Sequence, residues 1–309
     1  MKILVTGGAG FIGSHVADAY IEMGHEVVIV DNLSTGRMEN VNPKAQFFKM
    51  NIHDKEIFDV FKAEKFDIVN HHAAQMDIRL SVADPVYDAT NNIIGTINLL
   101  QASVKNNVKK FIFISSGGAI YGEQEYFPAD EKHPTRPLSP YGITKLTGEK
   151  YIYYYHHVYD LNYVILRYAN IYGPRQNPNG EAGVVAIFSN KLLTGEQPII
   201  NGNGLQTRDY VYVRDVVDAN LKAVDYNDNE CFNIGTGIET DVNELFNCLN
   251  HLTGAVTEEV HGPAQPGEQL RSVLNIDKAK RLLNWTPQTS LEEGLVKTVE
   301  FFKEYHNIK

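Results

Sequence analysis

The sequence has 309 residues, of which 43% are hydrophobic and 21% charged, which is ordinary for a globular protein of one large or two modest domains. Its formal net charge of -10 argues against a nucleic-acid partner. It shows neither an apolar stretch long enough for a membrane span nor a signal-peptide pattern. The two cysteines, Cys231 and Cys248, lack the spacing of a zinc site or a disulfide framework. We therefore expect a cytoplasmic protein without a metal ion.

The first half of the chain alternates short apolar runs with longer amphipathic segments. Strands are predicted at residues 2–5, 26–30, 45–50, 68–71, 110–115 and 163–167, and helices at 14–23, 56–64, 91–106 and 140–159. Strands that alternate with helices form βαβ units around a parallel sheet. The pattern predicts an α/β fold with a Rossmann-type, doubly wound parallel sheet of six or seven strands.

From about residue 170 the chain becomes dense in turn-forming residues. Helices are predicted at 184–194, 216–226, 241–252, 276–283 and 291–305, short strands at 198–201 and 209–213, a hairpin turn at 201–204 and a loop at 261–267. We expect residues 1–169 to form the Rossmann domain. Residues 170–309 are expected to form mainly a smaller α/β domain for the substrate, with parts of about 205–235 returning to the first domain.

A glycine-rich turn joins the first predicted strand to the first helix. Gly7, Gly10 and Gly13 allow the backbone to approach a pyrophosphate, and the helix N-terminus offers free N–H groups. Asp31 ends the second strand, where an acidic side chain accepts hydrogen bonds from adenosine ribose hydroxyls and repels a 2′-phosphate. The pattern predicts a site for NAD rather than NADP.

Tyr141 and Lys145 are one turn apart in the predicted helix at 140–159, so their side chains share a face. An ammonium beside a phenol favours the phenolate, which is the form that acts as a base. Moving the pKa of a phenol from about 10 to neutrality requires about 4 kcal/mol, more than one exposed ammonium supplies. We expect the second positive charge to come from bound NAD+.

Together with these motifs, three further segments resemble the extended short-chain dehydrogenase/reductase family, and within it the UDP-glucose (UDP-galactose) 4-epimerases: Asp31-Asn32-Leu33, Asn91-x-x-x-Gly95-Thr96 and Arg208-Asp209-Tyr210-Val211. The resemblance covers essentially the whole chain. It implies 4-epimerisation of UDP-hexoses by transient oxidation to a 4-keto sugar and re-reduction on the opposite face, with NAD tightly bound. It also implies a homodimer built on a four-helix bundle of the helices at 91–106 and 150–159.

The resemblance implies a catalytic trio of Tyr141, Lys145 and a serine at the end of the strand at 110–115. Ser115 and Ser116 are both available. Counting forward along the strand leads to Ser116, whereas counting back from Tyr121 leads to Gly117. An extra residue at this point reconciles the two counts, and we choose Ser116, which would hydrogen-bond the sugar C4 oxygen together with Tyr141.

The match also implies a set of NAD contacts beyond the glycine turn: Phe11, Ile12, Asp31, Asn32, Ser34, Thr35, Gly36, Ile52, Ala73, Asn91, Tyr141, Lys145 and Tyr168. Two positions depart from the family pattern. Asn51 replaces an Asp that faces the adenine amine in many relatives, and Met76 stands where some epimerases have a lysine.

On the substrate side, Asn170 and Arg208 match residues that bind the diphosphate of the sugar nucleotide. The second arginine of that clamp is replaced by Gln265, and Glu268 replaces an Asp that faces the uridine ribose. Arg271 is a candidate for the lost charge. Ser272 matches a position beside the hexose, where a small residue would admit N-acetylhexosamines.

Alternative activities differ in what they require after Ser116. Sugar-nucleotide dehydratases and decarboxylases need acidic side chains there, whereas this chain has Gly117-Gly118-Ala119. A non-catalytic NAD-binding regulatory protein has no use for Tyr141, Lys145 and Ser116 together. The 4-epimerisation of UDP-N-acetylglucosamine or UDP-glucuronate remains open, because the trio does not select the sugar.

Overall fold

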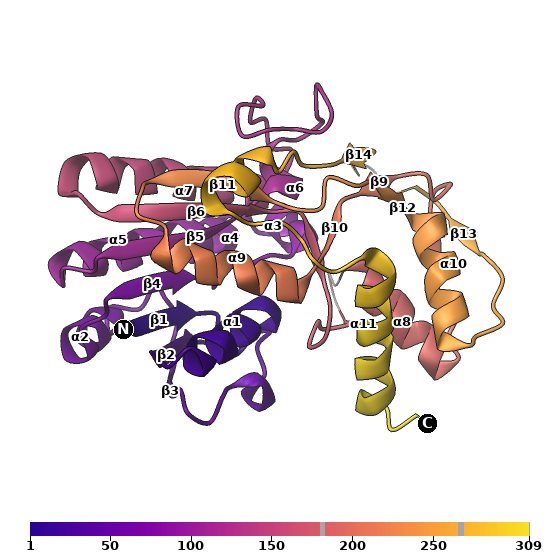
Figure 1. Cartoon of the computed structure of the whole chain (residues 1–309), viewed down its shortest axis with the longest axis horizontal. Helices are drawn as coiled ribbons and strands as arrows, with labels where there is room; N and C mark the ends of the chain where they lie inside the picture. Colours follow the sequence, from indigo (N-terminus) through magenta and orange to yellow (C-terminus); the bar gives the residue numbers. More distant parts are fainter. Residues whose placement is uncertain (180–182, 265–268, 309) are drawn as a thin grey trace.

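A parallel sheet of seven strands forms the centre of the larger part of the molecule (Figure 1). The computed structural model describes residues 1–179, 183–264 and 269–308. The strands are β1 (Lys2–Thr6), β2 (Glu26–Asp31), β3 (Gln46–Lys49), β4 (Ile68–His71), β5 (Lys110–Ser116), β6 (Asn162–Tyr168) and β11 (Glu230–Ile234), in the order β11-β6-β5-β4-β1-β2-β3. Six of them coincide with predicted strands, and β11 is an edge strand that the sequence pattern did not reveal.

Helices cover both faces of this sheet, as a doubly wound fold requires. They are α1 (Phe11–Glu22), α2 (Ile57–Glu64), α5 (Gly95–Lys105), α7 (Pro140–Tyr159) and α9 (Val213–Asp225). Successive residues of a strand point to opposite faces, so Ile3 and Val5 pack with α1 and α9, whereas Leu4 packs with α2, α5 and α7. The predicted Rossmann-type fold is therefore confirmed.

Helix α7 begins where the sequence predicts. Ser139 caps it by accepting a hydrogen bond from the Gly142 N–H at 3.1 Å, and Pro140 occupies the first helical position. Tyr141 therefore lies in the first turn and Lys145 in the second, on the face that packs against β5 and β6. Both side chains come close to the carboxyl edge of the sheet, where ligands of such folds bind.

The remaining elements form a smaller unit beside the sheet (Figure 1). Its helices α8 (Val184–Thr194), α10 (Val242–Thr253) and α11 (Leu291–Tyr305) pack around a core of their own. Its strands form three small sheets: β7 (Asn170–Tyr172) with β10 (Tyr210–Tyr212), β9 (Thr207–Arg208) between β12 (Thr240–Asp241) and β14 (Arg271–Ser272), and β8 (Ile200–Asn201) with β13 (His261–Gly262). Helix α9 packs on α1, and β11 extends the large sheet, so the chain returns from this unit to the first one.

Several short elements differ from the predictions. The turn at 201–204 closes no hairpin, because β8 pairs in parallel with β13 and the Gly204 carbonyl accepts a hydrogen bond from the start of α10. The predicted helix at 276–283 contains the π-helical turn η3 (Ala279–Leu283). The helix predicted at 91–106 begins with the π-helical turn η2 (Thr90–Ile94) and continues as α5, and unpredicted elements include η1 (Met38–Asn40), α3 (Ile78–Ala83), α4 (Pro85–Ala89) and α6 (Gly117–Ile120). The loop expected at 261–267 begins with β13, and its end lies outside the described residues.

None of the helices in the described part of the chain combines the length and the apolar composition that a bilayer span requires. No group of three or more His, Cys, Asp or Glu side chains in that part is arranged to hold a metal ion.

Candidate active site

The glycine turn between β1 and α1 is packed too closely for side chains. Gly7 has φ +70°, and a Cβ atom there would lie 2.7 Å from the Ala73 backbone nitrogen, just beyond the end of β4. A Cβ atom on Gly13 would lie 2.3 Å from the Gly7 carbonyl oxygen. Gly10 is the N-cap of α1 and has no side chain to cover the first turn, which begins with Phe11 and Ile12. The turn is a backbone cradle at a helix N-terminus, which is the arrangement that binds a pyrophosphate.

Asp31 is held at the end of β2, above this cradle. Its carboxylate accepts hydrogen bonds from the backbone N–H groups of Ala9 at 3.0 Å and Leu33 at 2.8 Å. Gly36 lies against it, since a Cβ atom there would be 3.0 Å from Asp31 Oδ1. A carboxylate has about four acceptor positions. Asp31 can therefore bond its own loop and still accept the ribose hydroxyls of a dinucleotide.

An open hollow of about 480 Å³ adjoins Asp31 at the ends of β2 and β3. Its lining includes Asn32, Ser34 and Asn51. The Asn51 amide oxygen accepts a hydrogen bond from Asn32 at 2.9 Å, and its amide group donates to Asp54. Asn51 is thus engaged on both sides, and its expected bond to an adenine amine would share an oxygen that Asn32 already uses.

The other residues predicted to contact NAD are spread along the same edge. Ile52 is buried against Gly95, and Ala73 donates its N–H to Thr6 Oγ1 at 3.2 Å. The Asn91 amide donates to the Tyr87 carbonyl at 2.8 Å. Tyr168 is a core residue whose hydroxyl accepts a hydrogen bond from Asn220 at 2.6 Å, so a contact with the cofactor would use its ring or backbone. Thr35 follows Ser34 in the loop after β2, and Met76 is 56% exposed.

The structure brings the predicted trio together. Ser116 ends β5, and its side chain is hydrogen-bonded to the Tyr141 phenol. The Lys145 ammonium donates to the Ile114 carbonyl at 2.9 Å and lies 5.9 Å from the centre of the Tyr141 ring. Ser116 is thus the serine that meets Tyr141, whereas the Ser115 hydroxyl donates to Glu149 at 2.5 Å.

Burial shifts the proton affinities of both groups away from the phenolate. Burial raises the pKa of Tyr141 to about 12; the negative charge of Asp88 also raises it, and the Ser116 hydrogen bond lowers it. Burial lowers the pKa of Lys145 to about 8, against the upward effects of Asp88 and Glu149. Lys145 alone therefore does not produce the phenolate, which agrees with the expectation from the sequence that one ammonium is insufficient. The positive charge of a bound oxidised nicotinamide remains the expected second contribution.

Two polar side chains, those of Ser116 and Asn170, lie beside the segment that follows Ser116. Residues 117–120, for which no element was predicted, form the short helix α6, and a Cβ atom on Gly117 would lie 2.6 Å from Leu274 Cδ1. A Cβ atom on Gly118 would lie 3.7 Å from Asn170 Oδ1 and 4.0 Å from Ser116 Oγ. Gly118, Ser116 and Asn170 therefore face one space, and this segment carries no acidic side chain to assist an elimination.

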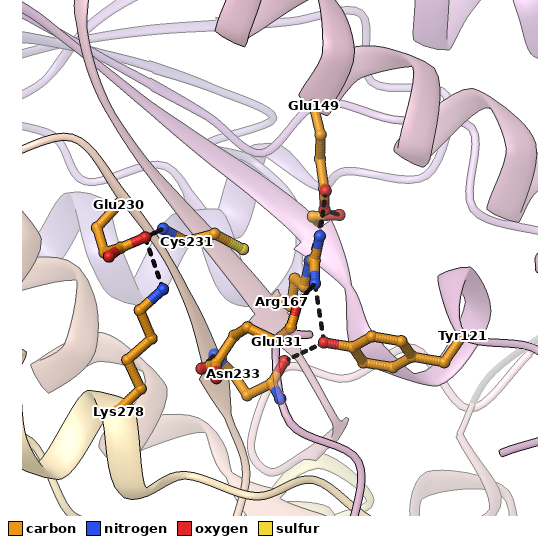
Figure 2. Close-up of polar contacts among 9 residues, drawn as sticks. Tyr121, Glu131, Glu149, Arg167, Glu230, Cys231, Asn233 and Lys278 are labelled. Carbon is orange, nitrogen blue, oxygen red and sulfur yellow. Dashed lines mark hydrogen bonds and ion pairs between the residues drawn. The ribbon is translucent and has the colours of Figure 1, made fainter. Parts of the chain in front are cut away.

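A buried polar network joins the helix that carries Tyr141 and Lys145 to the strands of the large sheet (Figure 2). Arg167 on β6 donates to both carboxylate oxygens of Glu149 on α7, at 2.9 and 2.6 Å. It also donates to the Tyr121 hydroxyl at 2.9 Å, which in turn donates to Asn233 on β11 at 2.7 Å. Because Glu149 also accepts from Ser115, one carboxylate ties α7 to β5 and β6. The sequence signal that could have revealed this role of Glu149 is its position one helical turn after Lys145.

The small sheet of the second unit separates two of the predicted substrate residues. Ser272 pairs with Arg208, and Arg271 pairs with Thr207. Neighbouring residues on a strand point to opposite faces, so Arg208 and Ser272 share one face and Arg271 lies on the other. There Arg271 forms a bidentate ion pair with Glu239 at 3.0 and 2.7 Å.

The structure thus does not place Arg271 beside Arg208, whose guanidinium donates to the Thr207 carbonyl at 2.8 Å. The predicted replacement of the lost charge by Arg271 has no support in this geometry. Gln265 and Glu268, the two departures from the family clamp, lie outside the described residues.

Residues 3–235 match the profile of the NAD dependent epimerase/dehydratase family. The chain belongs to this family. A crystal structure of a UDP-glucose 4-epimerase with UDP-glucose from Thermotoga maritima is 52% identical, has a TM-score of 0.98, and covers 99% of this chain and 100% of that one. A UDP-glucose 4-epimerase from Thermus thermophilus in complex with NAD is 41% identical, has a TM-score of 0.94, and covers 98% and 99% of the two chains. The UDP-glucose 4-epimerase of Mycolicibacterium smegmatis is 44% identical over 98% of this chain and 99% of that protein.

Membership of this NAD dependent family confirms the cofactor predicted from the glycine turn and Asp31. The glycine turn fits NAD, because Gly7 and Gly13 leave no volume for a Cβ atom where the pyrophosphate of the cofactor would approach the backbone. In this epimerase/dehydratase, the trio and the cradle lie at the same edge of the sheet. The roles of the individual residues remain predictions.

Proposed function

We propose that this family member interconverts UDP-glucose and UDP-galactose by inverting the configuration of the sugar at C4. The observation that carries the proposal is the hydrogen bond between Ser116 and Tyr141, beside Lys145 and without an acidic side chain on α6. Such a site can take up and return one proton on one oxygen. The described residues after Ser116 supply no second acid to expel water, which separates the site from that of a dehydratase.

NAD, held by the glycine cradle and Asp31, supplies the chemistry of a hydride acceptor and donor. Tyr141 removes the proton from the sugar C4 hydroxyl and later returns it to the C4 oxygen. Ser116 hydrogen-bonds the same oxygen and keeps it aligned with the phenol. Lys145 contributes positive charge beside the phenolate.

The substrate is held by its nucleotide diphosphate while the sugar turns over in the site. Asn170 on β7 and Arg208 on β9 are the proposed diphosphate contacts, and Ser272 lies next to Arg208 in the small sheet. A hold at the diphosphate leaves the 4-keto sugar free to present its opposite face. Because Ser272 is small, the same site would accept N-acetylhexosamine substrates, which is the second candidate activity.

The protein is proposed to act as a homodimer through α5 and α7. Exposed apolar side chains lie on α7 and just ahead of α5: Tyr151, Tyr154 and Val158 on α7 are 36%, 48% and 49% exposed, and Ile94, which ends the turn η2 before α5, is 49% exposed. An apolar surface of this extent on neighbouring helices is typical of an isologous interface.

The activity is tested with the purified protein and no added cofactor. We expect NMR to show interconversion of UDP-glucose and UDP-galactose, because NAD is regenerated in each turnover. UDP-N-acetylglucosamine and UDP-glucuronate, assayed in parallel, decide between the candidate substrates. Accumulation of reduced cofactor with a requirement for stoichiometric NAD would instead indicate a net dehydrogenase and contradict the proposal.

A further inference from the structure

A buried carboxylate beside the catalytic pair has no role in the mechanism above. The side chain belongs to Asp88 on α4, and Asp88 is fully buried, with 0% exposure. Its hydrogen-bond partners in the described ranges are neutral: Gln75 and Asn92 donate to Oδ1 at 2.9 and 3.0 Å, and Thr144 donates to Oδ2 at 3.0 Å. An ionised carboxylate is costly to bury without a cation in contact. The charge of Asp88 therefore has to be compensated from a little farther away.

The nearest candidates for that compensation lie on α7. Thr144, which contacts the Asp88 carboxylate, lies between Tyr141 and Lys145 in the helix, and its single hydroxyl proton is shared between Asp88 Oδ2 and the Tyr141 carbonyl oxygen at 2.9 Å. The carboxylate thus contacts α7 inside the turn that joins the two catalytic groups. Its charge acts on both of them, since it raises the pKa of Tyr141 and that of Lys145.

The hydrogen bonds around Asp88 favour its charged form. Two amides and a hydroxyl converge on it as donors, and a carboxylate that accepts such bonds retains its charge more readily. The Asn92 amide cannot turn over freely, because its oxygen accepts from the Gln75 N–H at 2.8 Å and its nitrogen donates to the Gln75 carbonyl at 2.8 Å. Burial raises the pKa of Asp88, and the Thr144 and Gln75 bonds oppose that shift.

Other ionisable groups also face Lys145. His71 and His72 at the end of β4 stay neutral at physiological pH, because burial lowers the pKa of His71 well below its usual range and that of His72 to about 3. Glu149, one turn further along α7, is neutralised by its bidentate contact with Arg167. Among these groups in the described part of the chain, Asp88 is the anion that no cation contacts directly.

We propose that Asp88 is a positioning residue of the epimerase reaction, whose negative charge, held at Thr144, keeps Lys145 protonated beside Tyr141. The inference rests on the proposed function for its kinetic part. A negative charge near two groups favours the bound proton on each of them. Removing the charge should therefore move both limbs of the pH profile of kcat/KM toward lower pH.

The test compares variants that separate charge from hydrogen bonding. Asp88→Asn removes the charge and keeps the shape: its oxygen can accept from Gln75 and Asn92, and its amide can donate to the Thr144 hydroxyl. Asp88→Ser removes the same charge with a smaller side chain. Thr144→Val keeps the charge and deletes the hydroxyl. Asp84→Asn, at the exposed cap of α4, makes the same charge change on the same helix, and asparagine caps as well as aspartate.

We expect both Asp88 variants to move both limbs down by about 1 pH unit. Asp84→Asn should leave the profile unchanged, and Thr144→Val should lower the plateau without moving the limbs. Limbs of Asp88→Asn that stay at the wild-type pH, or an equal displacement in Thr144→Val, would overturn the proposal and leave Asp88 a purely structural role.

A second measurement does not depend on turnover. The phenolate of Tyr141 is titrated by ultraviolet difference spectroscopy, each protein against its own Tyr141→Phe counterpart. Its midpoint should lie lower in Asp88→Asn than in the wild type, and an unchanged midpoint would contradict the inference. If the wild type fails to interconvert UDP-glucose and UDP-galactose, the proposed function fails, and this titration still decides the role of Asp88.

Discussion

Arg167 on β6 and Glu149 on α7 are buried together between the strand and the helix, and two parallel hydrogen bonds of 2.9 and 2.6 Å join them (Figure 2). The pair connects β6 to α7 one turn below Lys145, and Ser115 adds β5 to the same carboxylate. Ser116 lies on β5 and Tyr141 on α7, so the contact of Glu149 with both elements fixes the relative placement of these two residues. A buried ion pair contributes little net stability, but loss of one partner leaves the other as an uncompensated charge.

Glu149→Gln should therefore lower the free energy of unfolding by about 3–5 kcal/mol, because the Arg167 charge stays buried. The double variant Glu149→Leu with Arg167→Met removes both charges and should lose less than the single variant. Urea unfolding followed by circular dichroism measures both changes. Glu125→Gln, in the exposed ion pair with Arg136, is the control and should change stability by less than about 1 kcal/mol. A double variant no more stable than the single one would contradict the assignment.

Tyr141→Phe should reduce kcat by about 10²–10⁴-fold, since the ring remains and the proton acceptor is lost. Ser116→Ala should have a smaller effect, because the phenol keeps its position on α7. Turnover is followed by NMR, and the NAD content of each protein is measured after heat release. Both variants should retain NAD. Unchanged turnover of Tyr141→Phe with NAD bound would rule out the proposed base.

The sequence predicts those parts of the site that local signals define. Helix α7 carries its own start signal in Ser139 and Pro140, and its bounds agree with the prediction. The close approach of the glycine turn is likewise encoded locally, since no other residue fits at Gly7 or Gly13. Ser116 was chosen over Ser115 by counting along the strand, and the alternation of β5 sends the two hydroxyls to different partners.

Features that depend on tertiary pairing escaped prediction. Strand β11 has only three apolar residues and exists because it pairs with β6. Helices α3 and α4 are too short to show a helical period, and the Asp77 and Asp84 caps define them. Arg271 was suggested by its proximity in sequence, whereas the register of β14 on β9 turns it away from Arg208.

Gly13→Ala should abolish NAD retention. Its Cβ atom would lie 2.3 Å from the Gly7 carbonyl oxygen, so the cradle must open to accommodate it. The protein is purified, and bound nucleotide is quantified after heat release. Gly118→Ala is the control for NAD retention, because its Cβ atom would meet the nearest atom at an ordinary 3.7 Å. Full NAD content in Gly13→Ala would show that the pyrophosphate binds elsewhere.

Ile94→Glu should convert the proposed dimer to a monomer, because it places a charge among the exposed apolar side chains ahead of α5 and on α7. Light scattering coupled to gel filtration measures the mass. Val256→Glu is the control: this residue is fully exposed in the smaller unit, away from that surface, and its change should leave the mass unaltered. A dimer in both variants, or a monomeric wild type, would contradict the proposed interface.

Lys145→Met should stabilise the cofactor-free protein at neutral pH at the expense of activity. The folded-state pKa of Lys145 is about 8, below the ordinary 10.5, because the ammonium is buried. Between these values the unfolded chain binds more protons than the folded one, so the stability of the wild type rises with pH. Burial of the Lys145 ammonium therefore lowers the free energy of unfolding of the wild type by about 3 kcal/mol, and this full loss applies below pH 8. Urea unfolding from pH 7 to pH 10.5 should show the advantage of Lys145→Met shrinking toward pH 10.5. An advantage independent of pH would mean that Lys145 is not titrating, and that packing rather than charge sets the difference.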